Sequence, residues 1–103
     1  MKHVINNKEL GELAGFHEPS LYRVLIHNDD FTPMEFVVEV LESIFYMSRE
    51  RATGAMLEAH IEGKATCGSY PRDLAETKLE QMLAYAKRFE HPLTCSMEVA
   101  NCE

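Results

Sequence analysis

The sequence lacks the long apolar segments that membrane spanning or export requires. No stretch approaches the roughly 20 apolar residues that cross a bilayer, and the first residues, 1–8, are too polar for a signal peptide. Basic residues are also few. Ten Lys and Arg stand against seventeen Asp and Glu, giving a net charge of -7. Because nucleic acids and anionic membranes attract basic surfaces, this balance argues against both as partners.

Cysteine is scarce as well, and its spacing excludes the usual cysteine chemistry. The three cysteines, Cys67, Cys95 and Cys102, cannot all pair within one chain and show no metal-ligand spacing. No glycine-rich turn or oxyanion hole accompanies Cys95 with His60 or His91, so a catalytic cysteine is not predicted. We therefore expect a reduced, cytoplasmic protein, and the spacing of its cysteines and histidines predicts no metal or cofactor site.

The length of 103 residues predicts a single folded domain with a modest core. Residues 1–20 are polar, contain Gly11 and Gly15, and end in Glu18-Pro19-Ser20, a composition typical of a flexible arm. The domain is expected over residues 21–103. No internal repeat or low-complexity tract is present.

Apolar periodicity predicts the order β-α-α-β-α-β. Residues 21–27 alternate β-forming side chains with both faces largely apolar, which favours a central strand. Three helices are expected at about 33–45, 49–62 and 72–90, and two further strands at about 65–70 and 93–99. The fold class is α+β, a three-stranded antiparallel sheet packed with three helices.

The helix ends carry recognisable signals. Thr32 is the expected N-cap of the first helix, with Pro33 at the first helical position and Glu35 completing a capping box. Ser48 is expected to cap the second helix, and Gly63 to end it. The side chains expected to face inward are Val37, Val40, Leu41, Ile44 and Phe45 in the first helix and Leu74, Leu79, Met82, Leu83, Ala86 and Phe89 in the third. In the second helix, Ala52, Ala55, Met56, Ala59 and His60 share one face.

The most informative segment is Asn28-Asp29-Asp30, which follows the first strand and precedes a helix. One interpretation is an ordinary turn in which an Asp supports helix amides. A calcium loop fits poorly, because Pro33 stands at the sixth position, where an EF-hand needs glycine. His60 lies four residues after Met56, on the same helical face. It is either a hydrogen-bonded structural residue or a neutral acceptor for an ammonium group.

Apolar residues accompany this polar group, and each could simply belong to the core. Met34, however, stands in the first turn of its helix beside the acidic triplet. We therefore expect a pocket between the starts of the first two helices, suited to a ligand with a charged head and an apolar side chain, such as a peptide N-terminus. Methionine adapts well to varied apolar partners.

Several segments together resemble the ClpS family, bacterial adaptors that hand N-degron proteins to the Clp protease. The resemblance covers about 21–100. The segments that carry it are Tyr22-Arg23-Val24-Leu25, Asn28-Asp29-Asp30-Phe31-Thr32-Pro33-Met34-Glu35-Phe36-Val37, Arg51-Ala52-Thr53, Met56-Leu57-Glu58-Ala59-His60, Gly63-Lys64-Ala65-Thr66-Cys67-Gly68, Ala75-Glu76-Thr77-Lys78 and His91-Pro92-Leu93.

The resemblance implies a non-catalytic protein that binds substrates whose first residue is Leu, Phe, Tyr or Trp and delivers them to ClpA, the unfoldase that feeds ClpP. It implies that Asn28, Asp29 and His60 hold the α-amino group, that Met34 excludes β-branched first residues, and that Asp30 organises the turn. The implied side-chain pocket consists of Thr32, Met34, Val37, Met56, Ala59 and Leu93. The implied unfoldase contact lies near Asp73 and Lys78, and the arm, residues 1–20, would engage the unfoldase during delivery.

One departure concerns the pocket wall, since the family commonly has valine where this chain has Ala59. The smaller side chain predicts a roomier pocket. Two rival interpretations stay open at this stage. The first is an enzyme or metal-binding protein using Asp29, Asp30 and His60, and the second is a heterodimerising scaffold with the same fold but an occluded pocket.

Overall fold

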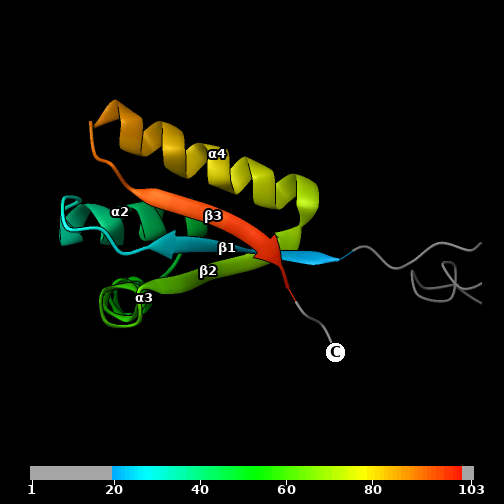
Figure 1. Ribbon diagram of the computed structural model, residues 1–103, viewed down its shortest axis with the longest axis horizontal. Coiled ribbons are helices and arrows are strands. Elements are labelled where there is room, and N and C mark those ends of the chain that lie inside the picture. The colour runs from blue at the N-terminus through cyan, green and yellow to red at the C-terminus, as the bar shows by residue number, and fades with distance from the viewer. Residues whose placement is uncertain (1–19, 101–103) are drawn as a thin grey trace, which may run out of the picture.

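The computed structural model describes residues 20–100, which form three helices and a three-stranded antiparallel sheet (Figure 1). The elements are β1 (Leu21–His27), α2 (Met34–Phe45), α3 (Arg49–Glu62), β2 (Lys64–Pro71), α4 (Arg72–Arg88) and β3 (Thr94–Val99). The strand order is β2-β1-β3, which confirms the predicted fold class and the central position of β1. The predicted arm lies outside the described residues, apart from Ser20.

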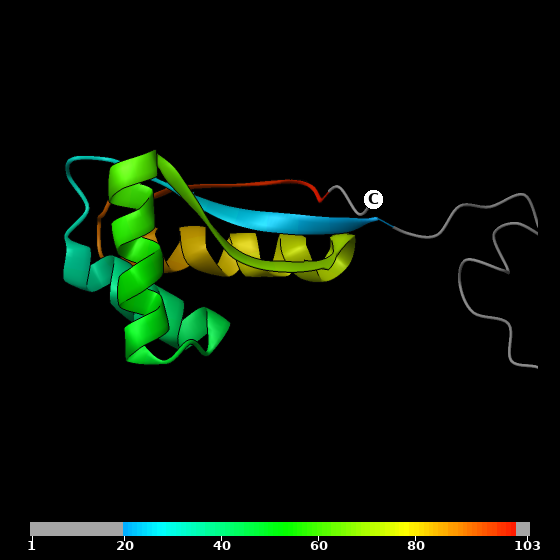
Figure 2. The ribbon, with the colours of Figure 1, turned by 90° about the horizontal axis from the view of Figure 1, so that it is seen from below.

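The two faces of the sheet differ in character. Val24 and Ile26 of β1 belong to the core, in one cluster with Ala75, Met82 and Ala86 of α4, and Figure 2 shows this helix packed on one side of the sheet. On the opposite face, Arg23 pairs with Glu98 at 3.1 Å and the His27 ring nitrogen Nε2 lies 2.7 Å from Ser96 Oγ. The prediction that both faces of this strand are largely apolar holds only in part: Leu25 is buried at 4% exposure, but polar side chains from β1 and β3 meet on the open face.

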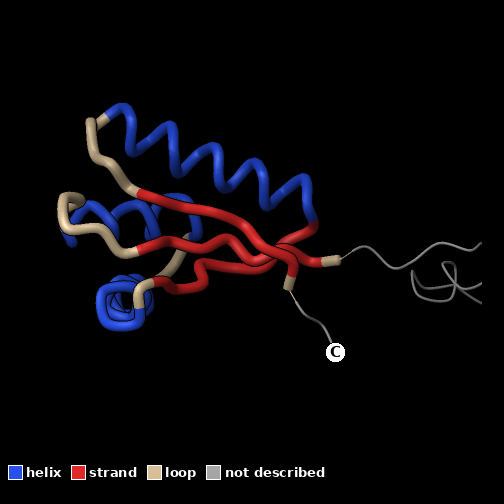
Figure 3. The backbone as a smooth tube through the Cα atoms, in the orientation of Figure 1, coloured by secondary structure: helices blue, strands red, loops and turns tan. Residues whose placement is uncertain are grey.

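Three connections gather at one end of the sheet (Figure 3). They are the loop from β1 to α2, the junction of α3 with β2, and the segment from α4 to β3. The Asn28 N–H donates to the Gly63 carbonyl at 2.9 Å, which ties the first of these connections to the second. This end of the sheet is where the polar triplet lies.

The helix ends only partly match their sequence signals. Ser48 Oγ accepts from the Arg51 N–H at 3.1 Å, and Gly63 ends α3 with a φ of 96°, as predicted. The predicted Thr32 cap is wrong. Pro33 occupies the N-cap position of α2, and no side chain caps the helix. The cause is Asp29, whose Oδ1 accepts from the Phe31 and Thr32 amides and folds the chain into a turn just before the helix.

Some of the apolar helix residues that the periodicity predicts to be buried are exposed. In α4 the buried residues are Ala75, Met82 and Ala86, whereas Leu74, Leu83 and Phe89 are 44%, 43% and 46% exposed. Small residues let α4 lie close to the sheet, so its larger apolar side chains flank the contact. In α2 the burial of Phe36 and Val38 was not predicted. The Phe36 ring stacks on Tyr85 of α4, with the ring centroids 5.4 Å apart, because α2 contacts α4 as well as α3.

Two free thiols of the described residues, Cys67 in the core and Cys95 packed against it, predict how stability changes with pH. Burial raises the pKa of Cys67 to about 12 and the pKa of Cys95 to about 11. In the unfolded chain a thiol loses its proton near pH 8.5. Above that pH the folded state holds protons that the unfolded state has released, so the free energy of unfolding falls as pH rises.

We expect the free energy of unfolding to drop between pH 8.5 and 11 by about 1 kcal/mol per pH unit for each such thiol. Urea denaturation at several alkaline pH values measures this slope. In Cys67→Ala the slope should be shallower, since only Cys95 remains as a thiol that keeps its proton in the folded state. Equal slopes in the two proteins would show that the Cys67 thiol ionises as easily in the folded state as in the unfolded chain.

Candidate functional site

A cavity of about 310 Å³ opens at the end of the sheet where the three connections meet. It is lined by Ile26, His27, Asn28, Asp29, Asp30, Thr32, Pro33, Met34, Val37, Met56, Ala59, His60 and Leu93. The structure thus brings together every residue predicted for the amino-binding group and for the side-chain pocket. Sequence reasoning missed Ile26, His27 and Pro33, although all three adjoin residues that it selected.

The cavity is not placed as the sequence predicted. It lies between the start of α2 and the C-terminal half of α3, whereas the prediction put it between the starts of both helices. The reason is that Asn28 is bonded to Gly63, at the end of α3. The start of α2 therefore faces Met56, Ala59 and His60 rather than the first turn of α3.

Asp29 organises the turn at the edge of the cavity. Its Oδ1 accepts from the Phe31 N–H at 2.8 Å and from the Thr32 N–H at 2.7 Å. The other carboxylate oxygen has no partner among residues 20–100. Asp30 is exposed and makes no such bond within the same part of the chain. The role of turn organiser, predicted for Asp30, belongs to Asp29.

His60 lies in the last turn of α3 and lines the same cavity. It is exposed, and its ring forms no hydrogen bond with another described residue. The structure therefore does not show the alternative of a histidine held by a hydrogen bond within the fold. Asn28, Asp29 and His60 all line the cavity and carry side-chain acceptors, and we call this group the polar rim.

The cavity is also lined by apolar side chains, which we call the apolar wall. They are Ile26, Met34, Val37, Met56, Ala59 and Leu93. Leu93 and Ala59 are 6% and 5% exposed, whereas Met34 is 48% exposed at the opening. A polar rim beside an apolar wall can accept a molecule with a cationic end and an apolar side chain. Burying a Leu-sized or Phe-sized group there contributes about 1.5 to 3 kcal/mol.

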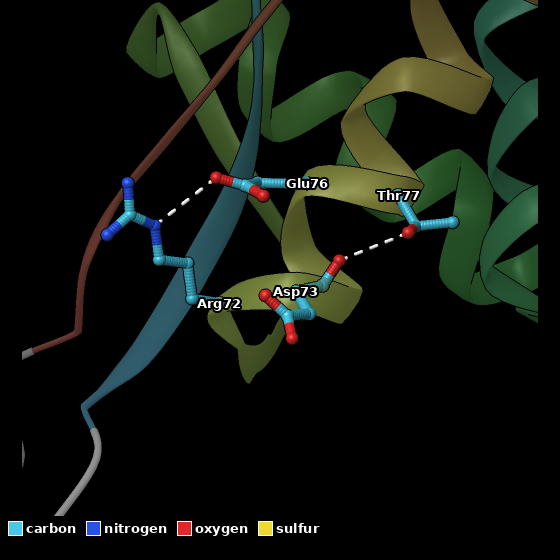
Figure 4. A network of polar contacts seen from close by, with 4 residues as sticks. All are labelled: Arg72, Asp73, Glu76 and Thr77. Atoms are coloured by element: carbon cyan, nitrogen blue, oxygen red, sulfur yellow. Dashed lines mark hydrogen bonds and ion pairs between the residues drawn. The ribbon is translucent and has the colours of Figure 1, made fainter.

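The residues predicted to contact an unfoldase lie elsewhere, on α4. Asp73 is exposed in its first turn. Its backbone carbonyl accepts from Thr77 Oγ1 at 3.1 Å, next to the Arg72–Glu76 ion pair at 3.2 Å (Figure 4). Lys78 is half-buried, and its ammonium donates to the Ile44 carbonyl at 2.7 Å. The same ammonium lies 5.1 Å from the centre of the Tyr46 ring, a favourable cation–π distance.

No helix within residues 20–100 is long and apolar enough to cross a membrane. In the same span, no group of three or more His, Cys, Asp or Glu side chains is arranged to hold a metal ion.

Comparison with known proteins gives consistent matches. The family described as "ATP-dependent Clp protease adaptor protein ClpS" matches residues 17–96. A ClpS adapter protein from Aromatoleum aromaticum is 56% identical over 80 residues, which are 78% of each chain. One from Vibrio cholerae is 54% identical over 89 residues, 86% of this chain and 84% of the relative. Among solved structures, Agrobacterium tumefaciens ClpS2 bound to L-phenylalaninamide matches with a TM-score of 0.77 and 39% identity, covering 80% of this chain and 99% of that one.

Proposed function

This chain belongs to the ClpS family, the adaptor proteins of the ATP-dependent Clp protease, and from that membership we propose what it binds and where it delivers it. It binds N-degron proteins by a first residue that is Leu, Phe, Tyr or Trp, and it hands them to a ClpA-type unfoldase for degradation. It acts in the cytoplasm and without catalysis. The observation that carries the proposal is the cavity, which sets the polar rim beside the apolar wall.

The polar rim suits a free chain end. An α-amino group has a pKa of about 7.7 to 8.0, so near neutrality it is largely an ammonium with three donors. The Asn28 side-chain oxygen, the uncommitted Asp29 oxygen and a neutral His60 nitrogen offer three acceptors. Each charge-assisted hydrogen bond contributes roughly 1.5 to 3 kcal/mol. An internal peptide segment has no ammonium and would leave these acceptors unpaired.

The apolar wall suits the side chain of the bound residue. Together the rim and the wall supply roughly 6 to 12 kcal/mol before the cost of ordering is subtracted. Micromolar affinity corresponds to about 8 kcal/mol, which lies within that range. The related ClpS2 was solved with L-phenylalaninamide, a molecule with a free amino group and an aromatic side chain, and this supports the same assignment here.

Met34 is the residue proposed to exclude β-branched first residues. It stands at the opening of the cavity, next to the acidic turn, where a branch at Cβ of the ligand would meet it. Ala59 lies on the wall and is 5% exposed. Its small side chain leaves more room than the valine common in the family, which favours the larger aromatic first residues.

The unfoldase contact is proposed at the start of α4, with Asp73 and Lys78 as its members. The Asp73 carboxylate is available, because only the backbone carbonyl of this residue is bonded within the described chain. Lys78 also holds the end of α2 through Ile44, so it would act partly by ordering this surface. Residues 1–20 would engage the unfoldase during delivery.

A panel of peptides that differ only in the first residue tests the proposed function. We expect micromolar binding for peptides that begin with Leu, Phe, Tyr or Trp, and affinities at least tenfold weaker for Ile, Val, Ser and Glu. The reason is that the cavity favourably buries a long apolar side chain without a branch at Cβ. Fluorescence anisotropy with labelled peptides measures the affinities. Comparable affinities for all peptides of the panel would show that the protein does not select its ligands by their first residue.

Met34→Ala provides the matched control within the same panel. Truncation of this side chain should raise the affinity for Ile and Val peptides while leaving Leu within a few-fold of its original value. If Ile and Val stay excluded, Met34 is not the residue that rejects them.

A further inference from the structure

Thr32 carries the one buried side-chain oxygen or nitrogen that lacks a hydrogen-bond partner within residues 20–100. Its Oγ1 exposes less than 1 Å² to solvent. The backbone explains the position, because the Thr32 N–H is held by Asp29 Oδ1 at 2.7 Å while the hydroxyl fails to cap α2. Buried hydroxyls are normally hydrogen-bonded, since leaving one unpaired costs free energy. An unpaired hydroxyl at this place calls for an explanation.

The cavity offers an explanation for the unpaired hydroxyl, because Thr32 lines it. In the chain Thr32 stands between Asp29 of the polar rim and Met34 of the apolar wall. Because this oxygen exposes less than 1 Å² to solvent, it does not face the open cavity in the structure. Rotation about χ1 carries the hydroxyl into one of the two other staggered positions at Cβ. A ligand that places a polar atom in the cavity can therefore recruit the hydroxyl, and an entirely apolar ligand leaves it unpaired.

The polar parts of a bound first residue identify the partner of this hydroxyl. The ammonium already has three acceptors in the polar rim, and the Asn28 amide and the His60 ring can also donate to the first carbonyl. The Asn28 and His60 side chains are exposed, so they suit the ammonium and the main chain of the ligand. A polar atom in the ligand side chain finds no hydrogen-bonding partner among the side chains of the apolar wall. We therefore consider that atom as the partner of the Thr32 hydroxyl.

We propose that the Thr32 hydroxyl is a specificity-determining group that hydrogen-bonds the phenol of a first-residue Tyr or the indole N–H of a first-residue Trp. A hydroxyl can both donate and accept, so it fits either group. This inference rests on the proposed function and refines it, because it ranks Tyr and Trp above Phe and Leu as ligands of this chain.

The test compares Thr32→Val with Thr32→Ser, using peptides that begin with Tyr or Phe and are otherwise identical. Valine keeps the shape of threonine without the hydroxyl, and the N–H bond to Asp29 does not depend on the side chain. We expect the Tyr-to-Phe affinity ratio to fall about fivefold in Thr32→Val and to be retained in Thr32→Ser. The Phe peptide has no polar atom in its side chain, so its change in affinity measures the part of each substitution's effect that does not involve the phenol.

Each other outcome contradicts the proposal in a recognisable way. Equal losses for Tyr and Phe in Thr32→Val would assign the hydroxyl to the peptide main chain or to the fold. Unchanged affinities for both would show that the hydroxyl does not reach the ligand. Failure of the unaltered protein to bind either peptide would instead reject the proposed function itself.

A second measurement does not depend on how the variants fold. The unaltered protein is titrated with peptides that begin with Tyr or with 4-methylphenylalanine, which replaces the phenol oxygen by a methyl group of similar size. Tyr should bind about fivefold more tightly. Equal affinity, or a preference for the methyl compound, would overturn the assignment.

Discussion

Acetylation of the α-amino group is expected to weaken binding of a Leu-initiated or Phe-initiated peptide by at least about a hundredfold. The acetyl group removes the positive charge and leaves one amide N–H where three ammonium donors stood. The acceptors of Asn28, Asp29 and His60 would then be covered by the ligand without a full set of partners. Unpaired polar groups at a covered site cost more than the net value of the bonds they lose.

The matched control for this experiment is the same peptide acetylated on a lysine side chain several residues from its start. It carries the same chemical modification and the same loss of one charge, but its chain end is untouched. Its affinity should stay within about twofold of the free peptide. Fluorescence anisotropy of the three peptides gives the comparison. Equal affinities for the peptides with free and acetylated chain ends would mean that the polar rim does not bind the ammonium group.

The fold could be predicted because each element is specified locally. The strand β1 coincides with the alternating run at 21–27, and α3 lies between its Ser48 and Gly63 caps as the sequence indicates. What could not be predicted is how the elements approach one another. Helical periodicity identifies apolar residues on α4 but does not reveal that Ala75 and Ala86 set the contact distance, which leaves Leu74 and Leu83 at its edge.

In the candidate site, the residues could likewise be predicted, but their hydrogen bonds could not. The composition of 28–34 is enough to expect a polar group next to an apolar pocket, and the structure places these side chains around one cavity. The choice between competing hydrogen bonds is not visible in the sequence. Thr32 could have capped α2 by accepting from an amide of its first turn, but Asp29 instead accepts from the Phe31 and Thr32 amides just before the helix. That outcome left the Thr32 hydroxyl unpaired and committed one oxygen of Asp29 to the turn.

Asp29 orders the turn with one carboxylate oxygen and is proposed to bind the ammonium with the other, so its substitution should have a second large effect on affinity. Asp29→Asn keeps an oxygen that can accept from the Phe31 and Thr32 amides, so the turn should survive. We expect the free energy of unfolding to change by less than about 1 kcal/mol. The remaining carboxylate oxygen, however, becomes an NH₂ group that faces the incoming ammonium with like polarity. Affinity for a Leu-initiated peptide should therefore fall roughly a hundredfold.

Asp30→Asn is the control that separates a local bond from the general negative charge of the site. It removes the same unit charge one residue away, from a carboxylate that is exposed and bonded to nothing within residues 20–100. Because solvent screens such a charge, its loss should reduce affinity by only a few-fold, and less at high salt. Parallel losses in both variants would mean that the cavity attracts cations through its summed charge and does not bond the ammonium at Asp29.

Asp29→Ala completes the series because it removes both functions of the side chain. The Phe31 and Thr32 amides would lose their acceptor, so the free energy of unfolding should fall by about 1 to 3 kcal/mol in addition to the loss of binding. Urea denaturation and peptide titration of Asp29→Asn and Asp29→Ala then separate the two roles. If Asp29→Asn loses as much stability as Asp29→Ala, its weaker binding reflects a disordered turn rather than a missing charge.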